Sequence, residues 1–117
     1  MAEENLKERR KAPRFKADGE VSLVLESGVA LEGTLKDLSR IGAFVALGHV
    51  NDTWAYQSAK LTLKTDVEGE FMVIKGQCAL VRITPKGVGI HIFDIDVDSR
   101  KNFVRFMGHV QQPENAI

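Results

Sequence analysis

The stretch EVSLVLESGVALEGTLK, residues 20–36, decides the fold because apolar side chains recur in it at every second position. Apolar residues recur with that period on both sides of Ser27-Gly28, at Val21, Leu23 and Leu25 before it and at Val29, Leu31 and Leu35 after it, with Gly33 at the remaining position of the series. A period of two is typical of a β-strand with one buried face, and Ser-Gly between two such runs is typical of a tight hairpin turn. We therefore expect an antiparallel strand pair with a two-residue turn, one face of which lines a core.

Further short runs of the same kind follow this hairpin and are separated by turn residues. They span residues 43–47, 58–65, 70–84 and 88–93. Asp37 interrupts the alternation before the first of these runs, so we expect the second strand to end at Lys36. Gly76 lies inside the longest run and predicts a bulge or bend.

The last element has a different period. Apolar residues fall at i, i+3, i+4 and i+7, at Phe103, Phe106, Met107 and Val110. This spacing predicts one face of a helix, for which Asp96 or Asp98 would provide the N-cap. The sequence thus predicts a mainly β fold: a six-stranded antiparallel β-barrel with a C-terminal α-helix and a flexible N-terminal arm.

The charged residues are balanced in number but not in position. The 117 residues include 16 basic and 16 acidic side chains, which disfavours a protein that coats long nucleic acids. Six of the 16 basic residues lie within residues 7–16, at Lys7, Arg9, Arg10, Lys11, Arg14 and Lys16. We predict a flexible basic arm over residues 1–16, a barrel with its helix over 17–110 and a disordered tail over 111–117.

Several functional classes lack the residues they need. The single cysteine, Cys78, excludes an intramolecular disulfide and a cysteine-based zinc site, and we expect it near the core. The histidines share no metal-ligand spacing, and no nucleophile–base pair stands out, so we expect neither a metal site nor an enzyme. No apolar run is long enough for a membrane span or a signal peptide, so we expect a cytoplasmic protein that does not bind membranes.

Two motifs carry recognisable binding chemistry. Residues 9–14 form RRxxxR, and residues 37–42 form DxSxxG. Arginine guanidinium groups can grip a phosphate or the O6/N7 edge of guanine with two parallel hydrogen bonds. Asp37 can accept hydrogen bonds from guanine or hold an arginine, Ser39 can donate one, and Gly42 permits an unusual backbone angle or a close approach of the ligand. Simple turn chemistry at residues 37–42 is the alternative, and both roles are compatible.

These motifs resemble those of the PilZ family, bacterial receptors for the second messenger cyclic di-GMP. Arg10 and Arg14 match the family's RxxxR, residues 37–42 match its second motif in the DLSRxG form, and GVGIHIFDI at 87–95 resembles a later family segment. The resemblance implies an arm that wraps over the ligand, without catalysis or a cofactor. It also implies regulation of a downstream protein, here unidentified, in motility, adhesion, or the exopolysaccharide production of biofilms.

The resemblance also implies the binding residues. Arg82 is the candidate for a residue that stacks on a guanine, and Arg9 is associated in the family with two stacked ligand molecules, although the sequence leaves one or two ligands open. The predicted ligand-binding residues are Arg9, Arg10, Arg14, Asp37, Ser39, Arg40, Gly42 and Arg82. The alternative functions are a small nucleic-acid-binding barrel, which would need more stacking aromatic residues, and an adaptor that binds only proteins.

Overall fold

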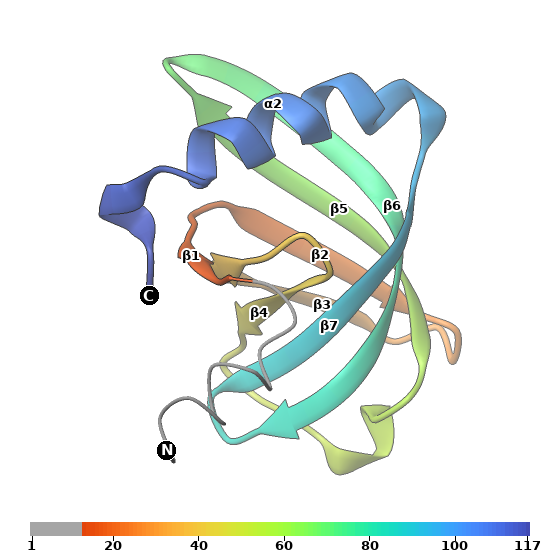
Figure 1. Ribbon diagram of the computed structural model, residues 1–117. Coiled ribbons are helices and arrows are strands. Elements are labelled where there is room, and N and C mark those ends of the chain that lie inside the picture. Colours follow the sequence, from red (N-terminus) through yellow and green to blue (C-terminus); the bar gives the residue numbers. More distant parts are fainter. Residues whose placement is uncertain (1–12) are drawn as a thin grey trace.

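The computed structural model describes residues 13–117, and within them the strands form one antiparallel sheet that closes on itself (Figure 1). The strands are β1 (Phe15–Lys16), β2 (Glu20–Leu25), β3 (Ala30–Leu38), β4 (Gly42–Ala46), β5 (Ser58–Val67), β6 (Glu70–Thr84) and β7 (Gly87–Ile95). They neighbour one another in the order β1-β3-β2-β5-β6-β7-β4, and the pairing of β3 with β4 closes six of them into a barrel. The predicted six-stranded barrel is therefore confirmed, and β1 is a short addition beside β3.

The helices lie outside the barrel wall. Helix α2 (Arg100–Val110) is preceded by the 3₁₀ turn η2 (Val97–Ser99) and followed by η3 (Pro113–Asn115), while η1 (Asp52–Trp54) lies between β4 and β5. Figure 1 shows α2 lying across one end of the barrel, over β5 and β6, with the C-terminal segment turning back toward β1. The C-terminal helix predicted from the sequence is thus confirmed.

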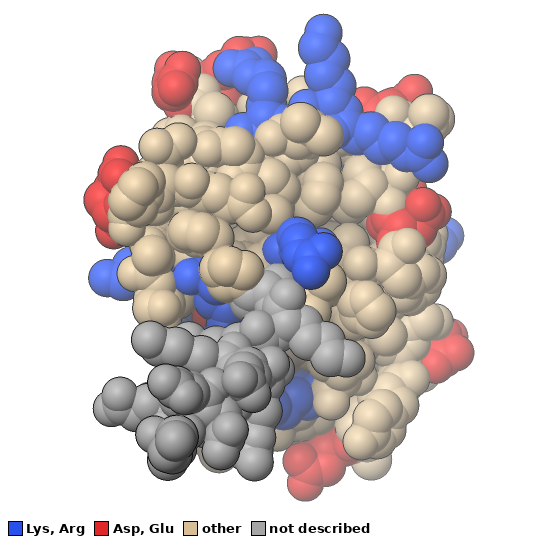
Figure 2. All heavy atoms as spheres, in the orientation of Figure 1, with Lys and Arg blue, Asp and Glu red and all other residues tan. Residues whose placement is uncertain are grey.

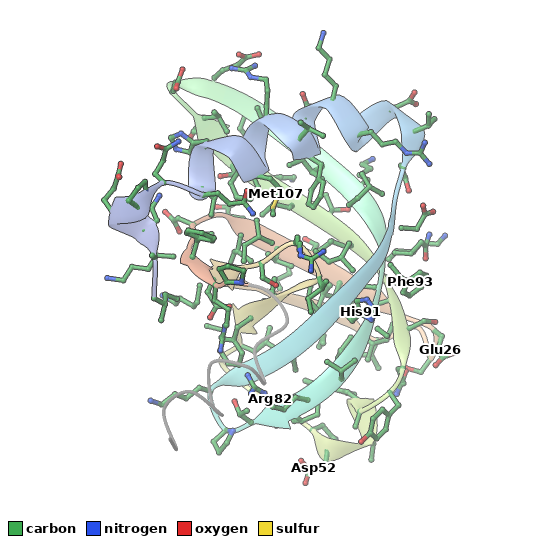
Figure 3. The ribbon with its side chains drawn as sticks, viewed as in Figure 1. Glu26, Asp52, Arg82, His91, Phe93 and Met107 are labelled. Carbon is green, nitrogen blue, oxygen red and sulfur yellow. The ribbon has the colours of Figure 1, made fainter. Side chains whose placement is uncertain are left out.

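The barrel interior is filled by the alternating apolar residues that the sequence indicated. Val21, Leu23 and Leu25 of β2 and Leu31 and Leu35 of β3 are all buried. Val29 belongs to the same alternating series but is 39% exposed, because it lies next to the hairpin turn, before β3 begins. Phe106 and Val110 of α2 are buried, and the Met107 side chain points from the helix toward the barrel core (Figure 3). The predicted helix face therefore closes one end of the core.

The loop before β5 contributes one aromatic residue to this core. Trp54 of η1 is 7% exposed, whereas Tyr56 is 83% exposed, so only the first of these two loop aromatics covers the barrel. Burial of a tryptophan gives a short loop a strong apolar anchor.

The hairpin between β2 and β3 is longer by one residue than the two-residue turn we expected. The amide of Gly28 donates to the carbonyl of Leu25 at 2.8 Å, and the amide of Leu25 donates to the carbonyl of Val29 at 2.8 Å. The connection therefore comprises Glu26, Ser27 and Gly28. Gly28 has a φ of 94°, a left-handed conformation that glycine adopts without a steric penalty.

Strand β3 continues past the point where the sequence predicted its end. The register between β3 and β4 shifts between Leu35 and Asp37, so a bulge absorbs the break in alternation and the strand goes on to Leu38. Leu38 is 1% exposed, and its burial stabilises the extension. A second shift lies between Gln77 and Cys78, one residue beyond the position expected from Gly76.

The start of α2 and the tail that follows the helix differ from the prediction. The N-cap position is Ser99, since Asp96 precedes η2 instead, and the Ser99 hydroxyl accepts a hydrogen bond from the Lys75 amide of β6 at 2.9 Å. The tail predicted as disordered forms η3, and Ala116 makes a β-bridge with Phe15. Backbone pairing therefore connects the last residues of the predicted arm with the tail. The arm before Pro13 lies outside the described residues.

The charged side chains in the view of Figure 2 lie mainly along its edges, with basic residues gathered over α2 and mostly uncharged atoms across the middle. Within residues 13–117, no helix combines the length and apolarity that a bilayer span requires.

Candidate ligand-binding site

An ion pair joins the two sequence motifs. The pairing of β1 with β3 sets Phe15 opposite Leu38 and Lys16 opposite Asp37, which brings Arg14 next to the Asp37 side chain. The Arg14 guanidinium then donates twice to the carboxylate, from Nη2 to Oδ2 at 2.7 Å and from Nε to Oδ1 at 3.3 Å. The Arg14 side chain is 36% exposed and that of Asp37 is 13% exposed. Asp37 therefore orients an arginine that still reaches solvent.

Ser39 organises the turn that follows β3. Its amide donates to the Gly42 carbonyl at 2.8 Å, and its Oγ accepts from the amides of Ile41 and Gly42 at 3.3 and 3.2 Å. The hydroxyl itself donates to the Gly42 carbonyl at 3.4 Å. The turn role that the sequence left open for Ser39 is thus present, because these bonds satisfy its buried hydroxyl within the turn.

Gly42 has a packing role that differs from the unusual backbone angle we considered. Its φ does not lie in the left-handed region. Instead, a Cβ at this position would collide with the carbonyl oxygen of Ile90 in β7. Gly42 is therefore required for the close approach of β4 to β7, in which it pairs with His91.

These elements surround an open cavity of about 640 Å³ on the outside of the barrel, which we name the site cavity. It is lined by Arg14, Asp37, Ser39 and Gly42 from the two motifs, and by side chains of β4, β6 and β7. Among these, the guanidinium carbon of Arg82 lies 5.9 Å from the centre of the Phe44 ring, a cation–π distance. Figure 3 shows that Arg82 and His91 come from the neighbouring strands β6 and β7.

The structure brings together five of the eight predicted residues. Arg14, Asp37, Ser39, Gly42 and Arg82 all line the site cavity. Arg40 is exposed and is not part of its lining, and Arg9 and Arg10 lie outside the described residues.

Sequence analysis missed Phe44 and His91 as parts of this site. The two-residue period of β4 places Phe44 on the same strand face as Gly42, and this was the available signal. His91 was expected on the outer strand face, and it is exposed there. Its position in the cavity follows from its pairing with Gly42, which only the strand register shows.

The chemistry of the site cavity suits binding. Its lining combines two guanidinium groups and one carboxylate with the apolar or aromatic residues Ile41, Phe44 and Val81. Such a surface can hold a planar group by stacking and an anionic group by charge-assisted hydrogen bonds.

Among residues 13–117 we find neither a candidate metal cluster nor an exposed cysteine. No group of three His, Cys, Asp or Glu side chains in this range is arranged to hold a metal ion. Burial raises the pKa of the Cys78 thiol to about 12, which keeps this core residue protonated and unreactive near neutral pH.

Known proteins share this architecture. The family model described as PilZ domain matches residues 8–109. No curated protein sequence matches the chain. Among solved structures, the inhibitor of motility MotI/DgrA from Bacillus subtilis superposes with a TM-score of 0.66 at 17% identity, covering 84% of this chain. The chain spans about half, 48%, of the length of that protein.

Two further structures are isolated PilZ domains. The PilZ domain of YcgR from Escherichia coli, solved with c-di-GMP, has a TM-score of 0.60 at 15% identity over 87% of this chain and 88% of that one. The PilZ domain of CeSA from a cellulose-synthesizing bacterium has a TM-score of 0.58 at 18% identity over 81% and 95%. At these identities the likeness shows a shared fold. Because the family model covers nearly the whole sequence, the chain belongs to the PilZ domain family.

Proposed function

We propose that this PilZ domain is a receptor for cyclic di-GMP that changes conformation on binding and thereby regulates a downstream protein. The observation that carries the proposal is the bidentate Arg14–Asp37 pair at the edge of the site cavity. Support also comes from the similarly folded YcgR domain, whose structure contains c-di-GMP.

The Arg14–Asp37 pair prepares a phosphate contact. The bonds to Asp37 use two of the five N–H donors of the guanidinium, Nε and one on Nη2. The remaining donors are available to a ligand phosphate while the carboxylate keeps the group oriented. Such preorganisation lowers the entropy that a side chain loses on binding.

The rest of the site cavity suits the guanine bases. The planar guanidinium of Arg82, already positioned over Phe44, would stack on a purine ring. Asp37 offers acceptors for guanine N–H groups, and Ser39 and Gly42 form the floor. Arg9 and Arg10 would add phosphate contacts from the arm, and closure of the arm would alter the surface offered to a partner, without a reaction at the site.

Titration of the full chain with cyclic di-GMP by isothermal calorimetry tests the proposal. We expect saturable binding at micromolar ligand in moderate salt, and a large loss of affinity in Asp37→Ala. Absence of binding at tens of micromolar ligand would refute it. Binding of long RNA or DNA with a steep salt dependence, unaffected by Asp37→Ala, would instead favour the nucleic-acid-binding alternative.

A further inference from the structure

The backbone of Arg14 is held from the far end of the chain. The amide of Ile117 donates to the Arg14 carbonyl at 3.1 Å, and the next residue pair, Phe15 and Ala116, forms an antiparallel β-bridge. On its other side, Arg14 leads directly into β1, which pairs with the end of β3 at Leu38 and Asp37. The segment that carries this arginine is therefore placed between the barrel wall and the C-terminal residues.

The C-terminal residues are in turn attached to α2. The Asn115 side chain donates from Nδ2 to the Val110 carbonyl at 3.0 Å, and the Gln112 amide donates to the same carbonyl at 2.8 Å. Val110 is 3% exposed and belongs to the barrel core. Residues 113–117, which we name the C-terminal clasp, thus connect a buried helix end to the backbone of Arg14.

We propose that the C-terminal clasp positions Arg14 for the ligand and couples the site cavity to α2. This inference rests on the proposed function, because it assigns Arg14 to the ligand. Asp37 fixes the guanidinium, while the clasp fixes the backbone from which that side chain extends. Both ends of the arginine are thereby ordered before a ligand arrives, which reduces the conformational freedom lost on binding.

The coupling runs in both directions. If the clasp favours the Arg14 position that binds ligand, then bound ligand stabilises the clasp by the same factor. Ligand should therefore slow amide exchange in residues 111–117, although none of the residues that line the site cavity lies in that segment. Ligand binding at the site cavity would then be coupled to the C-terminal end of α2.

The variant Ile117→Pro removes the N–H group that donates to the Arg14 carbonyl. Ala116 has a φ of −63° and a ψ of 138°, the extended conformation that a residue before proline prefers, so the substitution suits the backbone. The matched control is Ile117→Ala, which keeps the amide and shortens a side chain that is 57% exposed.

We expect Ile117→Pro to weaken cyclic di-GMP binding about 3- to 10-fold in calorimetry, the range expected for one hydrogen bond. The control should stay within about 2-fold. In an Arg14→Ala background the proline should cause no further loss, because there is no guanidinium left to position. Without ligand, the proline should accelerate exchange of the Ala17 amide, which donates to Lys36 at 3.1 Å beside β1.

The outcomes separate this inference from the proposed function. Equal affinities of the proline and alanine variants, or an undiminished proline effect in the Arg14→Ala background, overturn the clasp while cyclic di-GMP binding stands. If the unaltered chain does not bind cyclic di-GMP, the proposed function fails. The clasp is then judged by exchange alone: unchanged exchange at Ala17 in Ile117→Pro overturns it, and faster exchange supports it.

Discussion

Two cavities of nearly equal size lie near β1, and they differ in the charges that line them. The site cavity, about 640 Å³, contains Arg14 just before the strand, and a second cavity of about 700 Å³ contains Lys16 at its end. We name the second one the end cavity, since it lies where α2 ends. Its lining mixes both signs of charge, with Lys16 and Lys64 beside Asp18, Glu20 and Asp66.

Volume therefore does not distinguish the proposed binding cavity from its neighbour. The lining of the end cavity includes three carboxylates, so a phosphate placed there would meet repulsion as well as attraction. The site cavity has one carboxylate, and that group is already engaged by Arg14. The predictions below test this contrast, beginning with the largest effect.

Removal of Arg14 should have the largest effect on binding. We expect Arg14→Ala to weaken cyclic di-GMP binding about 100-fold, or about 2.8 kcal/mol, because it removes a phosphate donor and leaves the partly buried Asp37 unpaired. The matched control in the end cavity is Lys64→Ala, for which calorimetry should show a change of less than about 2-fold. A similar loss in both variants would place the ligand in the end cavity or show that general positive charge suffices.

Addition of a side chain at Gly42, in the lining of the site cavity, should destabilise the barrel. Gly42→Ala places a methyl group against the Ile90 carbonyl, so β4 and β7 must separate. We expect the free energy of unfolding in urea to fall by about 2 kcal/mol. Gly48→Ala is the control, since a Cβ there meets nothing within 4 Å. Equal stability of the two variants would contradict the packing role of Gly42.

Arg82 should contribute less than Arg14, since it offers stacking at the side of the cavity. We expect Arg82→Ala to reduce affinity about 10-fold, while Arg82→Lys, which keeps the charge and loses the planar group, should cost about 3-fold. Arg105 of α2 forms an exposed ion pair with Glu70 of β6, and its removal in Arg105→Ala should leave binding unchanged. If Arg82→Ala binds cyclic di-GMP with the same affinity as the unaltered chain, Arg82 does not contact the ligand.

Cys78 lines neither cavity and should report only on the core. Burial raises the pKa of its thiol to about 12 from 9.0, so the folded state keeps the proton while the unfolded state releases it above pH 9. Stability should therefore fall as pH rises from 9 toward 12, by about 1 kcal/mol at pH 10 relative to Cys78→Ala. Urea unfolding at pH 8 and pH 10 measures this, and an equal pH dependence in both proteins would contradict it.

Much of the fold could be predicted because it depends on local patterns. The two-residue period of 20–36 and the helical spacing of Phe103, Phe106 and Val110 follow from which faces must be buried. The errors lie where a contact distant in sequence overrides the local pattern. Asp37 stays in β3 because a bulge lets Leu38 reach the core, and Ser99 begins α2 with its hydroxyl bonded to β6.

By itself the sequence determined the strands, the terminal helix and the chemistry of the two motifs, since each depends on residues close together in the chain. Only the tertiary structure decided which side chains meet. The pairing of β1 with β3 sets Arg14 on Asp37 across 23 residues. The pairing of β4 with β7 adds Phe44 and His91 to the site, and the bridge between Phe15 and Ala116 brings Ile117 to the Arg14 backbone. The physical reason is that strand register is set by pairing between distant segments, where a shift of one residue turns every side chain to the other face.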